Sequence, residues 1–267
     1  MKNRFLCGLL AVCLLVAMLP ATVTRASADA NQTVSENLIT VLKQLEGFRA
    51  NAYVSGGQWS IGYGTAGSPG QTVTEAEADK ALRTHLETVE AKINAFAAKW
   101  NLSFSQQQFD ALASFSYNVG IGWMNASGRL RDAISGASEE KLLLGLSLWA
   151  NNGTSPDPGL LQRRMAEADI YLNGVYGKKS GTYTYTIFDA NGGTPGSGGE
   201  DKMQGYRRNG STQILVADPS LSGYTFAGWF VSMANEGDKL SYRYTEDMVF
   251  AENTTLFAVW QPASASG

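Results

Sequence analysis

The chain has 267 residues, a hydrophobic fraction of 44%, a formal net charge of −3 and one histidine. This acidic balance excludes nucleic acid as the main partner, because phosphate binding needs clustered lysine and arginine. It also excludes capture by anionic cell-wall polymers through bulk charge. With one histidine, and with both cysteines confined to positions 7 and 13, a transition-metal site cannot be assembled, and we expect neither a metal nor a cofactor.

The N-terminal segment has the layout of a secretory signal peptide. Lys2 and Arg4 precede an apolar run over 5–19 and small residues at 26–28. That run is shorter than the roughly 20 residues that span a bilayer, so we expect cleavage after residue 28, secretion and no stable membrane anchor. Removal of 1–28 leaves 239 residues without cysteine, in which 18 basic residues face 24 acidic ones. Disulfide stapling is therefore excluded.

The mature sequence divides into two parts with different periodicity. Residues 33–176 are mostly helical in pattern, whereas 182–261 are strand-like and rich in glycine, threonine and aromatics. The segment 177–181, Gly-Lys-Lys-Ser-Gly, separates them as a linker. We predict an α+β chain: a helix-rich domain with a small β-hairpin or sheet, followed by a small β-rich domain.

The first predicted helix carries an apolar stripe that stops at Glu46-Gly47; its members are Val34, Leu38, Val41, Leu42 and Leu45. Glu46 lies four residues after Leu42 and so projects from the apolar face, partly desolvated. It also lies at the negative end of the helix dipole. Both effects favour the protonated carboxyl that a general acid needs. Position alone would equally suit an ordinary surface residue at a helix end.

A glycine-rich stretch and further helices follow. Residues 52–65 place four glycines among tyrosine, tryptophan, serine and isoleucine, which predicts a short hairpin or small sheet. Thr74 and Glu77 form a capping box at the start of the next helix. Later helical patterns run roughly over 106–117, 138–149 and 160–171.

Ordered motifs along the helical part resemble the phage-type (T4-like) lysozyme family, glycoside hydrolase family 24. They are Glu46-Gly47, Ala52-Tyr53, Trp-Ser-Ile-Gly-Tyr-Gly-Thr at 59–65, Gln-Phe-Asp-Ala-Leu at 108–112, Tyr-Asn-Val-Gly at 117–120, and Gly-Leu-Leu-Gln-Arg-Arg at 159–164 with Glu167. The resemblance implies a lysozyme-like fold. It also implies a muramidase that cleaves the β-1,4 bond between N-acetylmuramic acid and N-acetylglucosamine in peptidoglycan.

The resemblance assigns three catalytic positions, one of which departs from the family. Glu46 takes the place of the acid, and Ser60 the place of a threonine. Ser55 stands where the family has an aspartate, and no acidic residue occurs between Glu46 and Glu75. A two-carboxylate glycosidase needs this second group. The only histidine, His85, is expected to be a surface or packing residue.

Three functions stay open for such a site. A hydrolase can rely on Glu46, with Ser55 and Ser60 positioning water. A lytic transglycosylase of the lambda-type endolysin kind needs one carboxylate, because the 6-hydroxyl of muramic acid attacks. An inactive site would leave a peptidoglycan-binding protein.

Candidate substrate contacts in the matching blocks are Tyr53, Trp59, Tyr63, Gln108 and Asn118. The three aromatics either stack on sugar rings or cover the core. The amides are candidates for hydrogen bonds to N-acetyl groups, and Asn118 equally for a helix cap or turn. Arg163 and Arg164 are expected to pair with Glu167 rather than to bind carboxylates of the peptide stem.

The second part resembles one Listeria-Bacteroides repeat, a module of bacterial surface proteins. The matching segments are Phe-Asp-Ala-Asn-Gly-Gly-Thr at 188–194, Gly-Tyr-Thr-Phe-Ala-Gly-Trp-Phe at 223–230 and Thr-Leu-Phe-Ala-Val-Trp at 255–260. The resemblance implies a non-catalytic, β-grasp-like module over 182–261 that holds the chain near the cell envelope or acts as a spacer. The aromatic side chains that we expect to pack on its sheet are Phe226, Trp229, Phe257 and Trp260.

Overall fold

The structure, a computed structural model, describes residues 31–125, 129–136, 138–152, 155–196, 204–208, 217–231, 243–245 and 247–263. The predicted signal peptide, 1–28, lies outside them. The helices are α1 Glu36–Glu46, α2 Glu75–Trp100, α3 Gln106–Val119, the 3-10 turn Gly122–Met124, α4 Arg129–Ile134, α5 Glu139–Ser147 and α6 Pro158–Asn173. The strands are β1 Arg49–Ser55, β2 Gln58–Gly62, β3 Thr65–Ala66, β4 Asn151–Asn152, β5 Ser155–Pro156, β6 Tyr183–Asp189, β7 Gln204–Arg208, β8 Tyr224–Phe230 and β9 Thr254–Pro262.

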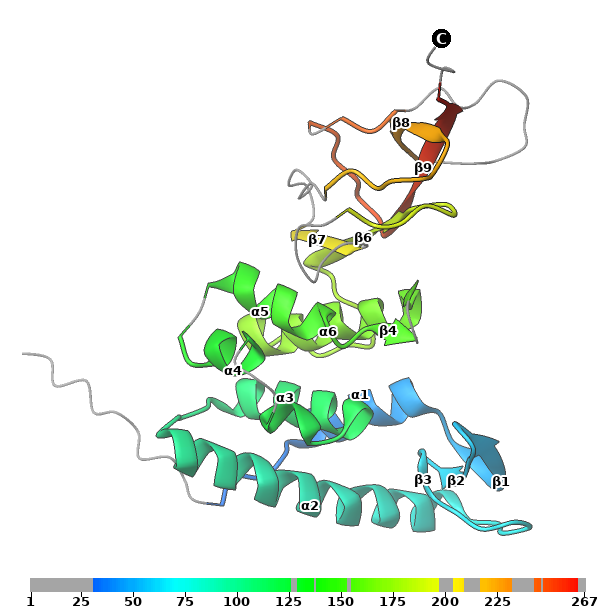
Figure 1. The fold of residues 1–267 in the computed structure, drawn as a ribbon. Helices are drawn as coiled ribbons and strands as arrows, with labels where there is room; N and C mark the ends of the chain where they lie inside the picture. Colours follow the sequence, from blue (N-terminus) through cyan, green and yellow to red (C-terminus); the bar gives the residue numbers. More distant parts are fainter. Residues whose placement is uncertain are drawn as a thin grey trace, which may run out of the picture.

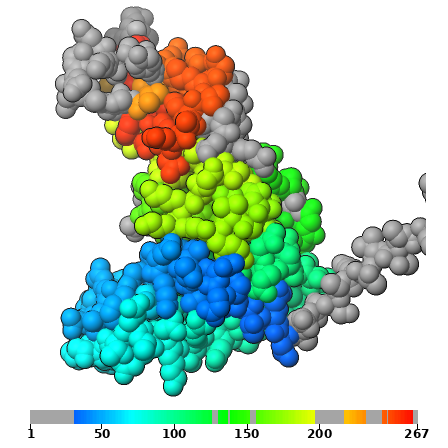
Figure 2. All heavy atoms as spheres, turned by 180° about the vertical axis from the view of Figure 1, so that it is seen from behind, coloured from blue at the N-terminus to red at the C-terminus, as the bar shows by residue number. Residues whose placement is uncertain are grey.

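The molecule is elongated, with helices in the middle and strands at both ends. The hairpin β1–β3 lies beside α2 at one end, and the sheet β6–β9 lies beyond α5 and α6 at the other (Figure 1). A space-filling view shows the same sequence of layers from the N-terminal to the C-terminal part (Figure 2). The predicted α+β class is confirmed. The short helix α4 and the pair β4–β5 were not predicted.

Helix α1 and the hairpin follow from local sequence signals. The Ser35 hydroxyl caps α1 by accepting from the Leu38 amide, and the predicted apolar stripe is buried in its middle and partly buried at Val34 and Leu45. Strands β1 and β2 pair up to Ser55, opposite Gln58, and leave a two-residue turn at 56–57. Both turn residues have positive φ, 56° and 79°, so this turn requires glycine.

The helical core is built around α3, whose residues 109–116 are all buried. It packs against α6 on one side and against α1 and α2 on others. Helix α2 begins with the predicted capping box at Thr74 and Glu77 and buries one face along its length. Among the described residues, no helix has both the length and the apolar character needed to cross a bilayer.

The C-terminal strands form one mixed sheet in the order β7-β6-β9-β8. Strands β6 and β9 are a parallel central pair with antiparallel neighbours, which is the strand arrangement of a β-grasp sheet. Its small core contains Phe188 and Trp229, with Phe226 and Trp260 packed against it. The prediction that Phe257 belongs to this core is wrong, because it alternates with the buried Leu256 and points to the other face.

The first strand of this sheet also closes the helical core. Tyr183, Tyr185 and Ile187, on one face of β6, belong to the same buried cluster as the helices. The connection to α6 is held by the buried carboxylate of Asp169, whose Oδ2 accepts hydrogen bonds from Ser180 Oγ and from the amides of residues 181 and 182 at 2.8, 3.1 and 3.3 Å. The predicted linker 177–181 is thus fastened to α6.

Replacing this acceptor should weaken the whole fold. In Asp169→Asn an amide of the same shape removes a buried acceptor oxygen from three partly buried donors, which costs about 1–3 kcal/mol of unfolding free energy. Urea unfolding of the full chain measures it. Asp132→Asn, on an exposed carboxylate, is the control and should leave the midpoint nearly unchanged. Equal midpoints for both variants would show that the hydrogen bonds to Asp169 contribute nothing to stability.

Candidate active site

Glu46 is the last residue of α1, and its side chain is 20% exposed. Arg163 Nη1 donates a 2.7 Å hydrogen bond to Glu46 Oε1. The other oxygen faces Gly64, which has φ of 82°; a Cβ there would lie 3.4 Å from Glu46 Oε2. Glycine thus satisfies a left-handed backbone and leaves this oxygen uncovered. The predicted partial burial of Glu46 is confirmed, with one oxygen fixed and one open.

The arginine that contacts Glu46 belongs to a buried charge cluster between α3 and α6. Arg163 Nε donates to Glu167 Oε1 at 3.1 Å, and its Nη2 donates to the Ser114 carbonyl at 3.3 Å. Ser114 Oγ donates to Glu167 Oε1 at 2.9 Å. Arg164 Nη2 donates to Asn118 Oδ1 at 2.7 Å, and Arg164 Nε pairs with Glu167 Oε2 at 2.9 Å without hydrogen-bond alignment. The predicted pairing of both arginines with Glu167 is confirmed.

The two arginines differ in how their charge is balanced. Burial disfavours the charged form of Arg163, but the Glu167 and Glu46 carboxylates outweigh this effect and raise its pKa. Burial lowers the pKa of Arg164, since Glu167 compensates only in part and Arg163 repels it. The carboxylates of Glu46 and Glu167 therefore balance the charges of the two guanidinium groups.

Tyr117, near the end of α3, connects this cluster to the hairpin. Its hydroxyl donates to the Tyr63 carbonyl at 2.6 Å. Burial raises the pKa of the Tyr117 phenol, and so do the charges of Glu46 and Tyr53, against the opposing charge of Arg163. Tyr117 thus joins α3 to the backbone of the hairpin.

Strand register decides which hairpin residues share a face with Tyr53. Ser60 pairs with Tyr53, and Ser55 follows Tyr53 by two residues, so all three lie on one face. Trp59 pairs with Val54 on the opposite face. Trp59 is 38% exposed, and it lies on the opposite face of the hairpin from the two serines. The two serines therefore share a face, and Trp59 does not.

Tyr63 belongs to the core and not to an open surface. It is 3% exposed, and its ring packs against Phe48 with a centroid separation of 5.8 Å. Its hydroxyl donates to Glu75 Oε1 at 2.8 Å; burial and this bond raise its pKa to about 12. Stacking of Tyr63 on a sugar is thus corrected to a packing role, because neither ring face is free.

The two predicted amide contacts lie at opposite ends of α3. Gln108 Oε1 accepts from the Ser105 amide at 3.0 Å and completes a capping box at the helix start. Asn118 is ten residues further along, about 15 Å by helical rise, and contacts Arg164. Asn118 therefore belongs to the charge cluster. Gln108 caps the start of α3, which corrects the prediction that it contacts the substrate.

His85 is an exposed residue of α2 whose ring meets Tyr117 edge-on, with centroids 5.0 Å apart. The prediction of a surface or packing residue is confirmed. A hollow of about 490 Å³ lies beside it, lined by Thr65, Glu77, Lys80, Ala81, Thr84, His85 and Thr88.

Sequence reasoning missed three features of this site. They are the bond from Arg163 to Glu46, the buried Ser114 and the Tyr117 bridge. The available signal was the position of Tyr117 and Arg163 in motif blocks, on α3 and α6, but no local pattern shows which side chains meet.

Comparison with known proteins identifies the family. A family model described as Phage lysozyme matches residues 43–167. The endolysin of Acyrthosiphon pisum secondary endosymbiont phage 1 is 30% identical over 145 residues, which cover 52% of this chain and 97% of that endolysin. The chain belongs to the phage lysozyme family. A model described as the Listeria-Bacteroides repeat domain matches residues 183–259.

The family match concerns the helical part. The endolysin of Bacillus phage B103 is 32% identical over 147 residues, 53% of this chain and 54% of that endolysin. The chain thus spans about half the length of this phage lysozyme relative. The structure of an endolysin from Escherichia coli O157:H7 phage FAHEc1 aligns with a TM-score of 0.48 and 29% identity, covering 54% of this chain and 96% of that one.

The charge cluster should dominate the stability of this phage lysozyme domain. Glu167 is 1% exposed, so Glu167→Gln leaves two buried guanidinium groups facing fewer carboxylates and should cost about 3–5 kcal/mol of unfolding free energy. Denaturant unfolding measures the loss. Glu36→Gln, which breaks an exposed ion pair with Arg83, is the control and should have little effect. A small loss in Glu167→Gln would contradict the central role of the cluster.

Proposed function

We propose that this chain is a secreted muramidase that cleaves the β-1,4 bond between N-acetylmuramic acid and N-acetylglucosamine in peptidoglycan, with Glu46 as general acid. The observation that carries the proposal is the largely buried Glu46 carboxyl at the end of α1, with Oε1 fixed by Arg163 and Oε2 beside Gly64. Membership of the phage lysozyme family and relatives named endolysins support a wall-degrading activity.

In this mechanism Glu46 protonates the glycosidic oxygen of the leaving sugar. Arg163 holds Oε1, so the proton is delivered from Oε2, on the side that Gly64 leaves uncovered. Positive charge develops on the sugar ring as the bond breaks. Water positioned by the Ser55 and Ser60 hydroxyls then attacks the anomeric carbon and releases its proton to the solvent.

The hairpin gives a specific reason to keep a second candidate reaction. Neither serine can take a proton from water without a base, and the described hairpin face offers no carboxylate. A lytic transglycosylase needs no external water, because the muramic acid 6-hydroxyl attacks and a 1,6-anhydro end forms. A peptidoglycan-binding protein without turnover is the third outcome.

Export and envelope attachment complete the proposal. The charged and apolar pattern over 1–28 supports secretion. The match of 183–259 to a Listeria-Bacteroides repeat domain supports a non-catalytic module that holds the enzyme at the cell envelope.

Loss of the acid provides the direct test. Glu46→Gln should lower the rate of turbidity loss of purified cell walls by about 10²–10⁴-fold, the usual contribution of a general acid. Glu87→Gln on the exposed side of α2 is the matched control and should clear walls at the wild-type rate. Wild type and Glu46→Gln that both sediment with peptidoglycan without clearing it would point to the binding protein.

The products separate the two reactions. Mass spectrometry should find reducing muramic acid ends for hydrolysis, whereas 1,6-anhydro ends would indicate transglycosylation. In Ser55→Asp a carboxylate is restored, and hydrolysis should become faster by about 10²-fold or more. Ser55→Asn has the same shape without the charge and should show no gain. Equal rates in both variants would exclude water activation from this position.

A further inference from the structure

Arg49, the first residue of β1, is exposed, and its guanidinium lies over an aromatic ring of the same strand. The Cζ atom is 4.3 Å from the centroid of the Tyr53 ring, well inside the range of about 6 Å for a cation–π contact. This contact engages the charge and the flat surface of the group, but it uses none of the N–H donors in a conventional hydrogen bond. Those donors are therefore available to a ligand.

The backbone of β1 holds Arg49 in this position. In a straight strand the Cα atoms of residues 49 and 53 would be about 13 Å apart, but the pairing of β1 with β2 is irregular between these two residues. The Ala50 carbonyl accepts instead from the Val73 amide at 2.9 Å. The Ala52 amide donates to the Gln71 carbonyl at 2.9 Å. Such an irregularity bends a strand and redirects its side chains, and here hydrogen bonds fix the bend, so Arg49 is oriented before a ligand arrives.

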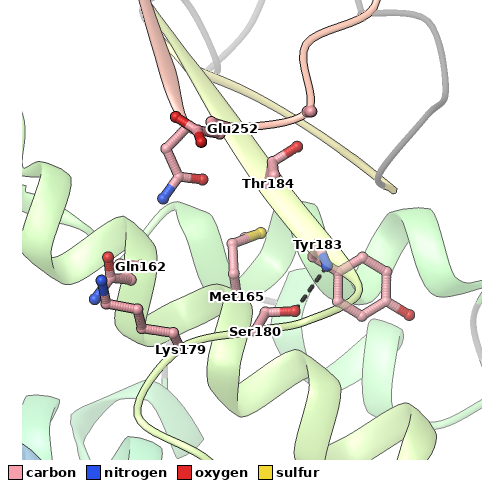
Figure 3. A pocket seen from close by; sticks show the side chains of 9 residues that line it. Gln162, Met165, Lys179, Ser180, Tyr183, Thr184 and Glu252 are labelled. Atoms are coloured by element: carbon pink, nitrogen blue, oxygen red, sulfur yellow. Dashed lines mark hydrogen bonds between the residues drawn. The ribbon is translucent and has the colours of Figure 1, made fainter.

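The charge of Arg49 has no acidic partner in the part of the chain that the structure describes, and its side chain donates no hydrogen bond there. Arg163, by contrast, is engaged by Glu167. Lys179 lines a pocket together with Glu252, so an anion entering that pocket would also meet a carboxylate (Figure 3). Arg49 is therefore better suited than either to bind an anion from outside the chain.

Arg49 also lies close to the candidate active site. It follows Glu46 by three residues, so the two Cα atoms are at most about 11 Å apart. Tyr53, over which the guanidinium lies, shares a face of the hairpin with Ser55 and Ser60. The aspartate of the family pattern would stand on this face at position 55. The change to serine therefore leaves Arg49 without an acid on the face that it occupies.

The chemistry of peptidoglycan limits which group can meet this cation. The sugar rings of N-acetylglucosamine and N-acetylmuramic acid are uncharged. Carboxylates occur on muramic acid, either as its free lactyl group or on the peptide stem attached there. A guanidinium binds a carboxylate through two parallel hydrogen bonds, which gives directional recognition as well as charge.

We propose that Arg49, held on the Tyr53 ring, is a specificity-determining residue that binds a carboxylate on the muramic acid of the substrate. The inference rests on the proposed function, because it takes peptidoglycan as the substrate of this site. Arg49 adds affinity for carboxylate-bearing glycan over neutral glycan, and it takes no part in the proton transfers of cleavage.

Calorimetric titration of the mature chain tests the proposal. The probes are chitobiose, the N-acetylglucosamine–N-acetylmuramic acid disaccharide with a free lactyl group, this disaccharide with its peptide stem, and the disaccharide-peptide with every carboxylate amidated. None of them contains the bond that the proposed muramidase cleaves, because muramic acid is the reducing sugar of each wall fragment. At least one carboxylate-bearing fragment should bind about tenfold or more tightly than both neutral ones. The tighter of the two identifies the lactyl group or the stem as the source.

Variants assign the preference to Arg49. Arg49→Met should bind all four fragments equally, and Arg49→Lys should recover only part of the preference, because it keeps the charge without the planar donors. Ser55→Asp should reduce the preference, since it places an acid on the Tyr53 face, whereas Ser55→Asn should keep it. Lys92→Met, at an exposed lysine of α2, is the matched control and should bind like the wild type.

Turnover separates a binding role from a structural one. Arg49→Met should raise the apparent KM for purified walls about tenfold and lower kcat by less, which is the result of lost substrate binding. Its thermal midpoint should stay near that of the wild type, because the side chain is exposed.

Equal binding of all four fragments by the wild type, or none, would overturn the proposal, as would an Arg49→Met variant that keeps the preference. A chain that prefers carboxylate-bearing fragments but does not clear walls would refute the proposed muramidase and leave the role of Arg49 standing. Wall clearing with the same KM in the wild type and Arg49→Met would refute this role and leave the muramidase standing.

Discussion

The packing of the helical part depends on the buried charge cluster of Arg163, Arg164 and Glu167. Charges taken out of water are strongly unfavourable unless each meets a partner in good geometry. Here the partners come from two helices, since α3 supplies Ser114 and Asn118 while α6 supplies the ions themselves. The packing of α3 against α6 therefore depends on the cluster as well as on apolar contact. Displacement of either helix would leave a buried charge without its partner.

The same cluster divides the candidate site into two halves of different character. The acid half is rigid, because Glu46 is joined through Arg163 to groups that cannot move without breaking buried bonds. The hairpin half carries Ser55 and Ser60 on a small sheet with a two-glycine turn, tied to the helices through the Tyr117 bond to Tyr63. The departure from the family pattern falls in the second half. The core thus supports the proposed acid, Glu46, whereas the chain differs from the family pattern at Ser55, in the proposed water-positioning half.

Local signals explain what the sequence predicts and what it does not. The stripe of α1 and the capping box at Thr74 depend on neighbours within one or two turns, so both were predictable. The Ser-x-x-Gln spacing at 105–108 was an equally local capping signal, which family resemblance obscured. The bond from Arg163 to Glu46 joins residues 117 positions apart, and no periodicity encodes it. Tyr63 was ambiguous because a hairpin aromatic has the same pattern whether its face is open or covered.

The fastening of the C-terminal sheet to α6 has a geometric consequence. Arg163 and Asp169 are six residues apart on one helix, about 9 Å along its axis, so Glu46 stands at a fixed offset from β6. A flexible linker of five residues would instead let the separation of the two parts vary by roughly 12 Å. A partner bound to the outer side of this sheet would therefore be held at a set distance from the Glu46 carboxyl.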